Sequence, residues 1–385
     1  MLNLEYKEWD KFKFIEIFNI KNGFYNKKPN IEAIGNIPFI GAVDNSNGIT
    51  EFYTLKNIEN SSKTGDKNNV NLEKKLFQSN AICVTNNGSV GYAYYQKSKF
   101  TCSHDVNPLY LKNKILNQSI AMFLITCIEK QRVCFEYSRK WRPKRMIKSN
   151  ILLPIEEPEK PNFEYMEEYS KSIINSKTEK YKQYAQKVLN SIEYKNIETL
   201  ENKEWEDFFL IDIFTTIQRG KRLTKQNQTK GNIPYISSTS LNNGVDNFIG
   251  NKTDVRIFSD CLTIANSGSV GASFYQPYNF VGSDHITHLK KENMNKYVYI
   301  FISTLTNRFS EKYNFNREIN DKRISREKIM LPINDRKEPD FQYMEQYMKN
   351  LTYKKVNQYL SFINYDNLKL SLVYFIQRLI NLILV

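Results

Sequence analysis

The strongest constraint on the fold of this chain is that it repeats itself along most of its 385 residues. Five short blocks recur in the same order, which predicts one structural unit built twice. The blocks and their second copies are Glu8-Trp9 and Glu204-Trp205, 36–40 (NIPFI) and 232–236 (NIPYI), 88–91 and 268–271 (both GSVG), Lys144-Arg145 and Lys322-Arg323, and 163–169 (FEYMEEY) and 341–347 (FQYMEQY). The offset between copies is smaller for the last three blocks than for the first two, which indicates extra residues in the first copy. We place them within the polar stretch 56–75, interpreted as an exposed loop.

Each copy of the repeat has the pattern of a β-rich unit followed by a helix. Short runs of β-branched and aromatic residues, among them 81–85 and 261–265, are bounded by Asn, Gly and Ser, which is typical of strands joined by tight turns. Helices are predicted at 117–135 and 294–313. The sequence therefore predicts an α+β fold made of two similar domains.

A long helix is predicted after each of these units. Pro154 and Pro332 end the two globular patterns. Residues 165–194 then contain no Gly or Pro and place apolar residues at spacings of three and four, and the second copy starts the same pattern at Tyr343. A helix of about 30 residues is about 45 Å long, which exceeds one turn of B-DNA at about 34 Å. Two such helices can act as a spacer and as a surface for partner helices.

The charge balance suits a polyanionic partner. The chain has 55 Lys+Arg against 41 Asp+Glu, a net charge of +14, and neutralising phosphates releases condensed counterions. A basic protein without such a partner has the same composition, so charge alone leaves both interpretations open. The five cysteines form no Cys-x-x-Cys pair and the N-terminus has no signal-peptide pattern, which predicts a cytoplasmic protein with reduced cysteines. The apolar stretch Leu368–Val385 is interrupted by polar and charged residues and is predicted to pack on other helices, with no membrane as partner.

These blocks together resemble the specificity subunits of type I restriction-modification systems, and the related specificity subunits that pair with a fused methyltransferase–nuclease chain. The resemblance rests on a Trp-x-x-Phe start, a Gly-Asn-Ile-Pro-[Phe/Tyr]-Ile strand, an [Asn/Ser]-Gly-Ser-Val-Gly turn and a Leu-Pro end, and it covers both copies. It implies two β-rich target-recognition domains, residues 1–155 and 203–333, each reading half of a bipartite double-stranded DNA target. Spacer helices in 156–202 and 334–385, the latter with the apolar tail, would pack antiparallel with pseudo-two-fold symmetry.

The same resemblance implies partners and cofactors. The helices would dock methyltransferase subunits, with a restriction (nuclease) subunit in the same complex. S-adenosylmethionine, and ATP with Mg²⁺ for cleavage in a type I system, would be bound by those partner subunits. The chain itself is expected to bind no cofactor or metal and to be a non-catalytic specificity subunit.

The motifs of the corresponding catalytic chemistry are missing. Asn107-Pro108-Leu109-Tyr110 resembles the Asn/Asp-Pro-Pro-aromatic loop of amino-methyltransferases, but Leu replaces the second proline and no Gly-rich cofactor turn precedes it. Asp335-Arg336-Lys337 and Pro339-Asp340 come in the wrong order for a nuclease, and no phosphate-binding loop exists. His285-x-x-His288 would place its two side chains on opposite faces of a strand, which argues against zinc. These absences argue against a standalone methyltransferase.

The main candidates for DNA contact lie in a basic segment before each Leu-Pro boundary. In the first copy, residues 130–148 contain eight Lys and Arg against one acid, with Tyr137 and Trp141 interleaved. Arginine forks suit guanine edges and phosphates, while aromatic rings can pack on sugars or bases, so DNA contact is favoured over a solvated helix face. In the second copy acids separate the basic residues and both interpretations stay open. The candidates are Arg139, Lys140, Arg142, Lys144 and Arg145 in the first copy and Arg317, Lys322 and Arg323 in the second.

Three turns supply further candidates. The turns at 86–89 and 266–269 can aim polar groups into a DNA groove, or they can be hairpin turns and nothing more. The turn at 219–222 is basic. The candidates are Asn86, Ser89, Asn266 and Ser269 in the first two turns and Arg219, Lys221 and Arg222 in the third.

A function of another class stays open, namely a non-catalytic duplicated scaffold that binds protein or glycan. A scaffold gives no reason for the two copies to differ most in their polar and basic loops. Divergent loops on a shared frame are what the reading of two different half-sites requires.

Overall fold

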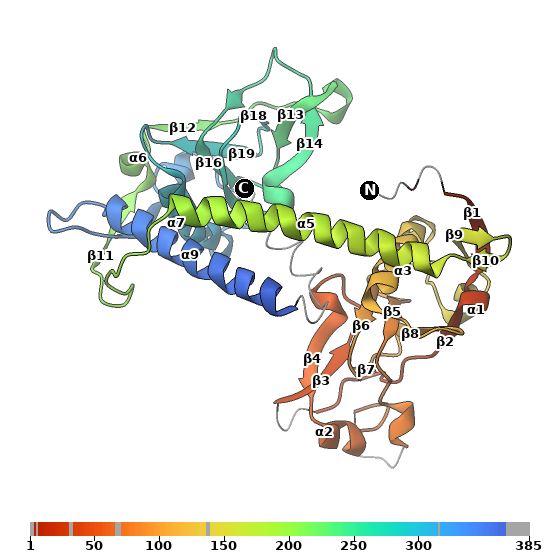
Figure 1. Cartoon of the computed structure of the whole chain (residues 1–385). Helices are drawn as coiled ribbons and strands as arrows, with labels where there is room; N and C mark the ends of the chain where they lie inside the picture. Colours follow the sequence, from red (N-terminus) through yellow and green to blue (C-terminus); the bar gives the residue numbers. More distant parts are fainter. Residues whose placement is uncertain are drawn as a thin grey trace. The chain divides into compact units, whose positions relative to one another are not determined.

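The computed structural model describes residues 4, 7–30, 34–65, 71–135, 139–314 and 316–366. Tyr137 and the apolar stretch Leu368–Val385, for which DNA contact and helix packing are predicted above, lie outside these residues. The chain divides into two compact units, with the boundary between residues 181 and 182, inside helix α5 (Phe163–Ser191; Figure 1).

The first unit combines an antiparallel ribbon, two small sheets and short helices. The ribbon pairs β1 (Trp9–Lys13) with β9 (Asn150–Glu157), and β10 (Lys160–Pro161) joins the other edge of β9. One sheet has the strand order β2-β8-β5-β6 and the other β4-β3-β7. The remaining elements are α1 (Phe14–Ile17), β2 (Phe18–Ile20), β3 (Ile34–Ile40), η2 (Ser46–Gly48), β4 (Ile49–Tyr53), α2 (Leu55–Asn60), η3 (Leu72–Lys74), β5 (Ala81–Thr85), β6 (Ala93–Gln96), β7 (Thr101–Cys102), β8 (Val106–Leu111), α3 (Gln118–Glu129), η4 (Lys130–Cys134) and α4 (Pro143–Met146).

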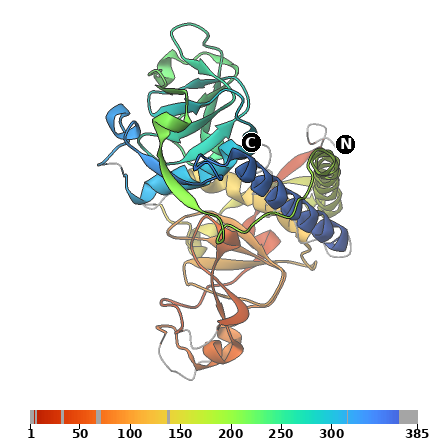
Figure 2. The same ribbon diagram turned by 90° about the vertical axis from the view of Figure 1, so that its left-hand side faces the viewer.

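The second unit builds most of the same elements in the same order. The ribbon β11–β20 corresponds to β1–β9, and the sheet β12-β19-β16-β17 corresponds to β2-β8-β5-β6. The sheet β14-β13-β18-β15 has one strand more than its counterpart. In both views the teal strands of the two sheets lie above α9 (Figures 1 and 2), whereas β11 lies below α9 in Figure 1. The elements are β11 (Trp205–Phe209), α6 (Leu210–Ile213), β12 (Thr216–Arg219), η5 (Lys225–Asn227), β13 (Lys230–Ile236), η6 (Asn242–Gly244), β14 (Val245–Ile249), β15 (Ile257–Phe258), β16 (Cys261–Ala265), β17 (Ser273–Gln276), β18 (Phe280–Gly282), β19 (Ile286–Lys290), α7 (Lys296–Thr306), η7 (Asn307–Glu311), α8 (Asp321–Ile324), β20 (Lys328–Pro332) and α9 (Phe341–Asp366).

The predicted α+β class, the repeated domains and the long helix after each are confirmed. Helix α5 has 29 residues and α9 has 26. Each begins at a capping side chain, whose oxygen satisfies a backbone N–H of the first turn. The Oδ1 atoms of Asn162 and Asp340 accept hydrogen bonds from the backbone N–H of Tyr165 (2.8 Å) and Tyr343 (2.9 Å). The antiparallel packing of the two helices and their pseudo-two-fold symmetry stay predictions.

An aromatic stack joins the ribbon, a short helix and the long helix in each unit. In the first unit the Trp9 ring stacks on Phe123 of α3 (centroids 6.0 Å apart), and Phe123 meets Tyr169 of α5 edge-on at 5.8 Å. In the second unit Trp205 stacks on Phe301 of α7 at 6.2 Å, and Phe301 meets Tyr347 of α9 edge-on at 5.9 Å. The repeated Trp of the first block and Tyr of the last block are therefore parts of one core contact.

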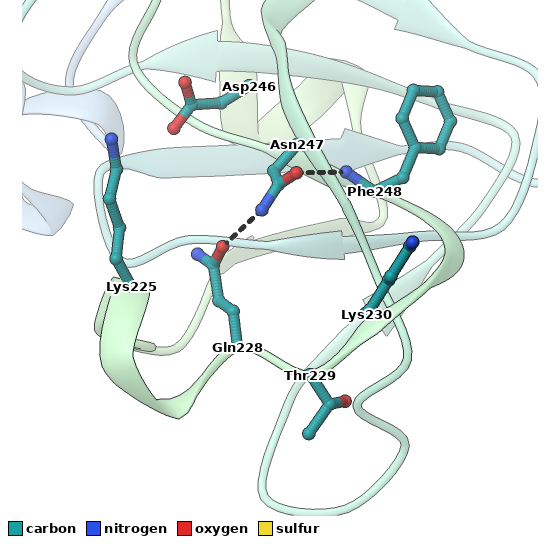
Figure 3. A pocket seen from close by; sticks show the side chains of 7 residues that line it. All are labelled: Lys225, Gln228, Thr229, Lys230, Asp246, Asn247 and Phe248. Carbon is teal, nitrogen blue, oxygen red and sulfur yellow. Dashed lines mark hydrogen bonds between the residues drawn. The ribbon is translucent and has the colours of Figure 1, made fainter.

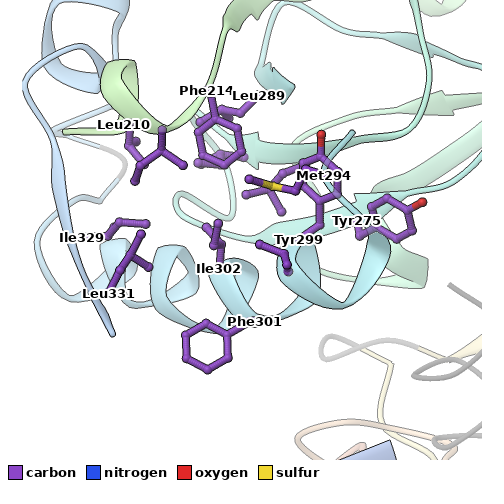
Figure 4. Packing of buried hydrophobic residues seen from close by; sticks show 14 of the residues in the cluster. Leu210, Phe214, Tyr275, Leu289, Met294, Tyr299, Phe301, Ile302, Ile329 and Leu331 are labelled. Atoms are coloured by element: carbon purple, nitrogen blue, oxygen red, sulfur yellow. The ribbon is translucent and has the colours of Figure 1, made fainter. Parts of the chain in front are cut away.

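The core of the second unit is continuous from the central sheet to the long helix. Strand β16 is buried along its whole length. Leu262 and Ile264 of this strand belong to the same buried cluster as Phe301 and Ile302 of α7 and Met344 of α9. Figure 4 shows Ile302 and Tyr299 of α7 directed toward the sheet residues, whereas Phe301 points to the opposite side of the helix. The central strand is buried on both faces, and its one polar side chain, Thr263, donates to the Phe274 carbonyl at 3.1 Å.

The hairpins β3–β4 and β13–β14 turn at equivalent Asn-Gly pairs. Asn47 and Asn243 have φ of 53° and 58°, and the glycines that follow have φ of 74° and 81°. Asn and Gly tolerate this left-handed conformation better than other residues do. Each Asn side chain also donates to a backbone carbonyl, of Tyr95 (3.2 Å) or Tyr275 (3.4 Å), which fixes the hairpin on the neighbouring strand.

The extra residues of the first copy lie where the sequence predicts them, between β4 and β5. Residues 54–80 join these strands, whereas residues 250–260 join the end of β14 to β16. The interpretation as an exposed loop is wrong for much of the segment, because α2 contributes the buried Ile58 and Lys75 is fully buried. The Lys75 ammonium donates to the carbonyls of Ile58 (3.2 Å) and Glu59 (2.8 Å). It therefore satisfies carbonyls at the end of α2, as cationic side chains near a helix C-terminus can do.

Replacing Phe301 by Ala should lower the free energy of unfolding of the second unit by about 3–5 kcal/mol, because the change removes the middle ring of a stack and leaves a cavity. Urea unfolding followed by tryptophan fluorescence measures this loss, since Trp205 lies on the affected ring. The control is Leu241→Ala, at a side chain that is 70% exposed. This control should change stability by less than about 0.5 kcal/mol. Equal unfolding midpoints for the two variants would contradict the role given to the stack.

Candidate nucleic-acid interface

The basic segment of the first unit is anchored by a buried tryptophan. The Trp141 ring stacks on Phe135 (centroids 4.6 Å apart) and meets Phe14 edge-on at 5.2 Å. Its Nε1 donates to Ser149 Oγ at 2.9 Å. The prediction that this ring packs on sugars or bases is therefore wrong. The buried Trp141 ring fixes the start of the short helix α4. Arg142 is the residue before this helix, and Pro143 is its first residue, a position that suits proline.

Arg139 and Arg317 occupy equivalent positions, and each lies over an aromatic ring. The guanidinium carbon of Arg139 is 5.9 Å from the centre of the Phe135 ring, and that of Arg317 is 5.4 Å from the centre of Tyr313. Both arginines are exposed. A ring supports the guanidinium plane and leaves its N–H edge in solvent, which is a geometry that can bind a phosphate or a guanine edge.

Lys144 and Lys322 form a second equivalent pair, in the first turns of α4 and α8. Both are exposed. Lys140, by contrast, is half-buried, and its backbone carbonyl accepts a hydrogen bond from Arg145 Nη1. The exposed lysines present flexible point charges, which suit phosphate oxygens.

Arg145 and Arg323 have the same structural role in the two copies. Arg145 Nη1 donates to the backbone carbonyl of Lys140 at 2.8 Å, and Arg323 Nη1 donates to the carbonyl of Glu318. Each bond closes the loop that precedes the short helix. A guanidinium has five N–H groups, so this bond leaves others available to a phosphate.

An acid among the basic residues of the second copy is turned inward. The Glu327 carboxylate is buried, and Lys312 Nζ donates to both of its oxygens at 2.9 Å. The Tyr313 hydroxyl also donates to it, and burial followed by this contact raises the pKa of Tyr313 to about 12. The hydroxyl therefore stays protonated. Because the ion pair with Lys312 balances the charge of Glu327, this carboxylate does not offset the surface charge of Arg317 and Lys322.

The structure brings the turn at 86–89 together with the basic segment in the first unit. Asp105 Oδ1 lies 3.6 Å from Arg142 Nη1 and accepts a hydrogen bond from Asn87 Nδ2 at 3.0 Å. The same oxygen is 3.3 Å from His104 Nε2. The sequence singled out the turn and the arginine, but it missed the carboxylate between them.

The equivalent place in the second unit has different chemistry. His285 replaces Asp105, and its Nδ1 is 2.7 Å from Ser267 Oγ. Asn320, which caps α8, replaces Arg142. The two copies therefore differ at an exposed edge next to the same turn, although their cores match.

The two turn asparagines are internal structural residues. Asn86 is 1% exposed and donates through Nδ2 to Asn107 Oδ1 at 2.7 Å, and Asn266 is 0% exposed and accepts through Oδ1 from Thr287 at 2.9 Å. Neither side chain faces the surface, so the contact surface proposed below omits them. Ser89 and Ser269 are half-buried beside glycines with φ of 66° and 61°, so the turn geometry itself is as predicted.

The basic turn after β12 is partly engaged within its own unit. Lys221 Nζ forms an ion pair with Asp254 at 2.8 Å, and Arg219 is half-buried. Arg222 is exposed. Between them Gly220 packs so closely on the backbone that an added Cβ would lie 2.0 Å from the Ser283 carbonyl oxygen. Only glycine fits there, and Arg222 is the member of this turn best placed to meet a ligand.

A polar hollow of about 440 Å³ lies beside the β13–β14 hairpin, and it was not predicted from the sequence (Figure 3). Its floor holds Gln228 and Asn247, joined by a hydrogen bond of 2.7 Å, and Phe248 beside them is 55% exposed. The equivalent residue of the first unit, Phe52, is 45% exposed. The signal available in the sequence was a phenylalanine at matched positions of the two copies, 52 and 248.

Comparison with known proteins identifies the family of these two units. The family model for the type I restriction modification DNA specificity domain matches residues 6–183 and again residues 202–360. The chain belongs to this family. Its two domains are a duplicated DNA specificity domain, and the chain is a specificity subunit of a restriction-modification system.

Two individual relatives and one solved structure are similar to this chain. The specificity subunit of a type II restriction enzyme from Heyndrickxia coagulans is 29% identical over 288 residues, which is 74% of this chain and 82% of the relative. A protein of Mycoplasma pneumoniae that bears the name of a type I specificity subunit is 26% identical over 53% of this chain and 57% of its own length. Among solved structures, the type I S subunit from M. genitalium covers 95% of both chains, with 17% identity and a TM-score of 0.48.

This specificity subunit is not itself an enzyme. The segment that resembles a methyltransferase loop is part of strand β8, where Asn107 is buried and donates to the Lys21 carbonyl at 2.8 Å. Within the described residues no group of three or more His, Cys, Asp and Glu is placed to hold a metal. The same part of the chain contains no helix long and apolar enough to cross a membrane.

The two histidines of the His-x-x-His pair have separate surroundings in the specificity subunit. His288 is buried, stacks on Phe258 with centroids 3.9 Å apart, and its Nδ1 donates to the Gln218 carbonyl at 2.8 Å. His285 lies at the turn with a side chain that is 54% exposed. Burial is the largest influence on His288 and lowers its pKa, so the ring is neutral near pH 7.

This burial predicts that the second unit loses stability in mild acid. The unfolded chain takes up a proton near a pH of about 6.5, whereas folded His288 resists protonation. The unfolded state therefore binds more protons as the pH falls through that value, and the free energy of unfolding should drop by at most about 1.4 kcal/mol per pH unit from this group. Urea unfolding between pH 7.5 and 5.5 measures the slope, which should shrink in His288→Asn but not in the control Leu241→Ala, at an exposed apolar side chain. Identical slopes in the wild type and in His288→Asn would show that His288 does not cause the loss of stability in acid.

Proposed function

We propose that each domain reads one half of a bipartite, asymmetric double-stranded DNA target. The observation that carries this proposal is the pair of equivalent cation sets, Arg139 with Lys144 and Arg317 with Lys322, held on a repeated frame and directed to solvent. Exposed cations at matched positions suit the phosphates on either side of two half-sites. The net charge of +14 supports the same partner.

The proposed contact surface includes most of the residues predicted from sequence. Around α4 and α8 it consists of exposed or half-buried cations, and the half-buried turn serines and the basic turn after β12 complete it. Its members are Arg139, Lys140, Arg142, Lys144, Arg145 and Ser89 in the first domain and Arg317, Lys322, Arg323, Ser269, Arg219, Lys221 and Arg222 in the second.

We further propose residues 1–155 and 203–333 as the target-recognition domains and 156–202 and 334–385 as spacer segments that dock the partners. Helix α5 has 29 residues, which makes it about 44 Å long. Its length and that of α9 support a spacer role, since one turn of B-DNA is about 34 Å. The expected partners are methyltransferase subunits and a restriction subunit.

The chemistry of the complex would then belong to those partners. S-adenosylmethionine, and ATP with Mg²⁺ if cleavage follows the type I scheme, would bind to them and not to this chain. The complex would act in the cytoplasm, in keeping with the five cysteines, all of them free thiols.

Purified alone, the chain should bind random duplex DNA with an affinity that falls steeply with salt, and it should transfer no methyl groups. Produced together with its methyltransferase subunit, it should direct adenine methylation at a split sequence, which methylome sequencing with and without this gene detects. Salt-independent DNA binding, or none, would favour the scaffold that binds protein or glycan. Methyl transfer by the isolated chain would refute the non-catalytic role.

Alanine at Arg142 and at Lys322 should affect different halves of the target. If Arg142 forks onto a guanine edge, its loss costs about 1–3 kcal/mol and relaxes specificity at one base pair. If Lys322 contacts only phosphate, its loss weakens all sequences alike and reduces the salt slope by about one unit. Binding to duplexes altered in one half-site at a time separates these cases. Lys11→Ala, which removes an exposed cation of β1 outside the proposed surface, is the control. Unchanged affinity in both variants would show that Arg142 and Lys322 do not contact DNA, and the contact surface would then have to lie at other turns.

A further inference from the structure

The β3–β4 and β13–β14 hairpins place different polar pairs at one equivalent position. The strands pair in the same register, so Glu51 of β4 corresponds to Asn247 of β14 and the exposed Phe52 corresponds to Phe248. In each domain a side chain from the segment before the hairpin reaches this position. Gln228 bonds to Asn247 at 2.7 Å, and Lys28 forms an ion pair with Glu51 at 3.4 Å. The strand pairing and the neighbouring phenylalanine are shared, whereas the hydrogen-bonding pair differs between the two domains.

In the second domain, the hydrogen bond between Asn247 and Gln228 orients the Gln228 amide, so that its donor and its acceptor lie side by side. Asn247 Oδ1 accepts from the Phe248 backbone N–H at 2.9 Å, and its Nδ2 donates to Gln228 Oε1. Within the described part of the chain Gln228 Nε2 has no hydrogen-bond partner, and Oε1 keeps a second lone pair. The Gln228 amide therefore presents the donor and acceptor that match adenine N7 and N6 in the major groove, while Asn247 positions it.

The rest of the hollow fits a base edge flanked by phosphates (Figure 3). Phe248 is 55% exposed, and it offers an apolar surface of the kind that contacts a thymine methyl group. Lys225 and Lys230 are exposed at the rim and can meet the phosphates on either side. Asp246 lies on the same side of the hollow as Lys225 in Figure 3 and would repel a phosphate placed over it, so Lys230 on the other side is the less hindered phosphate contact.

The first domain carries the complementary chemistry. Glu51 can accept from cytosine N4, and Lys28 can donate to guanine O6 or N7 of the same base pair. Both side chains are partly exposed, at 38% and 46%. An acid and a cation side by side match a G·C pair, as an amide beside an apolar ring matches an A·T pair.

We propose that this hairpin position determines a base pair in each half-site, with Gln228 reading the adenine of an A·T pair in the second and Lys28 with Glu51 reading a G·C pair in the first. The inference rests on the proposed function, since it requires that each domain reads half of a split DNA target. It adds the base identity and the side chains that select it.

The decisive variant exchanges the pair while keeping the frame. Full-length chain carrying Gln228→Lys with Asn247→Glu, produced with its methyltransferase partner, should methylate a motif in which one A·T pair of the second half-site has become G·C. The first half-site should be unchanged. A wild-type motif without an A·T pair in the second half-site would overturn the inference, as would an unchanged motif in the variant or a change in the first half-site. Absence of any split motif for the wild type would instead refute the proposed function.

A binding measurement decides the case in which the double variant gives no methylation. Wild-type chain should bind a synthetic duplex of its own motif about 5- to 150-fold more tightly than the same duplex with that A·T pair replaced. Gln228→Ala, which keeps the backbone of the segment, should lose this preference while its melting temperature stays near that of the wild type. Gln226→Ala, at an exposed amide outside the hollow, should keep the preference. Retention of the full preference by Gln228→Ala would overturn the proposal.

Discussion

The arrangement of both domains depends on one repeated contact, the aromatic stack that joins the ribbon to the long helix. Trp205, Phe301 and Tyr347 come from three separate parts of the chain, and burying them together fixes the start of α9 against α7. Aromatic pairs in such geometry contribute about 0.5–1.5 kcal/mol beyond the burial of their area. The same contact is made in the first domain by Trp9, Phe123 and Tyr169. Because the stack packs the first turns of the long helix into the domain, the rest of the helix can extend beyond the domain while the domain keeps its hydrophobic core.

The shared frame leaves the two domains free to differ at their edges. In the first, Asp105 lies between Arg142 and the turn at 86–89, and in the second His285 and Asn320 take these places. The cations over aromatic rings are kept, whereas the groups suited to hydrogen-bonding a base are exchanged. Such a division separates binding strength, which phosphate contacts supply, from sequence preference, which base contacts supply.

The sequence predicted the architecture well because its signals are local and occur twice. The Trp, Gly-Ser-Val-Gly and Leu-Pro blocks mark strand pairs and turns by their residue types, and the second copy excluded chance. The surface was harder to predict, because exposure depends on contacts between distant residues. Trp141 lies in a run of arginines and lysines, yet Phe135 and Phe14 enclose its ring. The turn asparagines are polar and follow a strand, but bonds to Asn107 and Thr287 hold them inside.

The same physical difference decides which positions can carry specificity. The Asn86 and Asn266 side chains bond to buried partners, and removing either would leave polar groups unpaired at a cost of about 1–3 kcal/mol for each group. Asn247 and Phe248 are exposed, and such side chains can be exchanged for less than about 0.5 kcal/mol. This cost explains why both domains have an asparagine at the buried position. The hairpin position is exposed and supported by a shared register, with Pro38 or Pro234 opposite the phenylalanine, so it can change its chemistry without changing the fold. A chain that must read two unlike half-sites with one fold needs its variable residues at such a place.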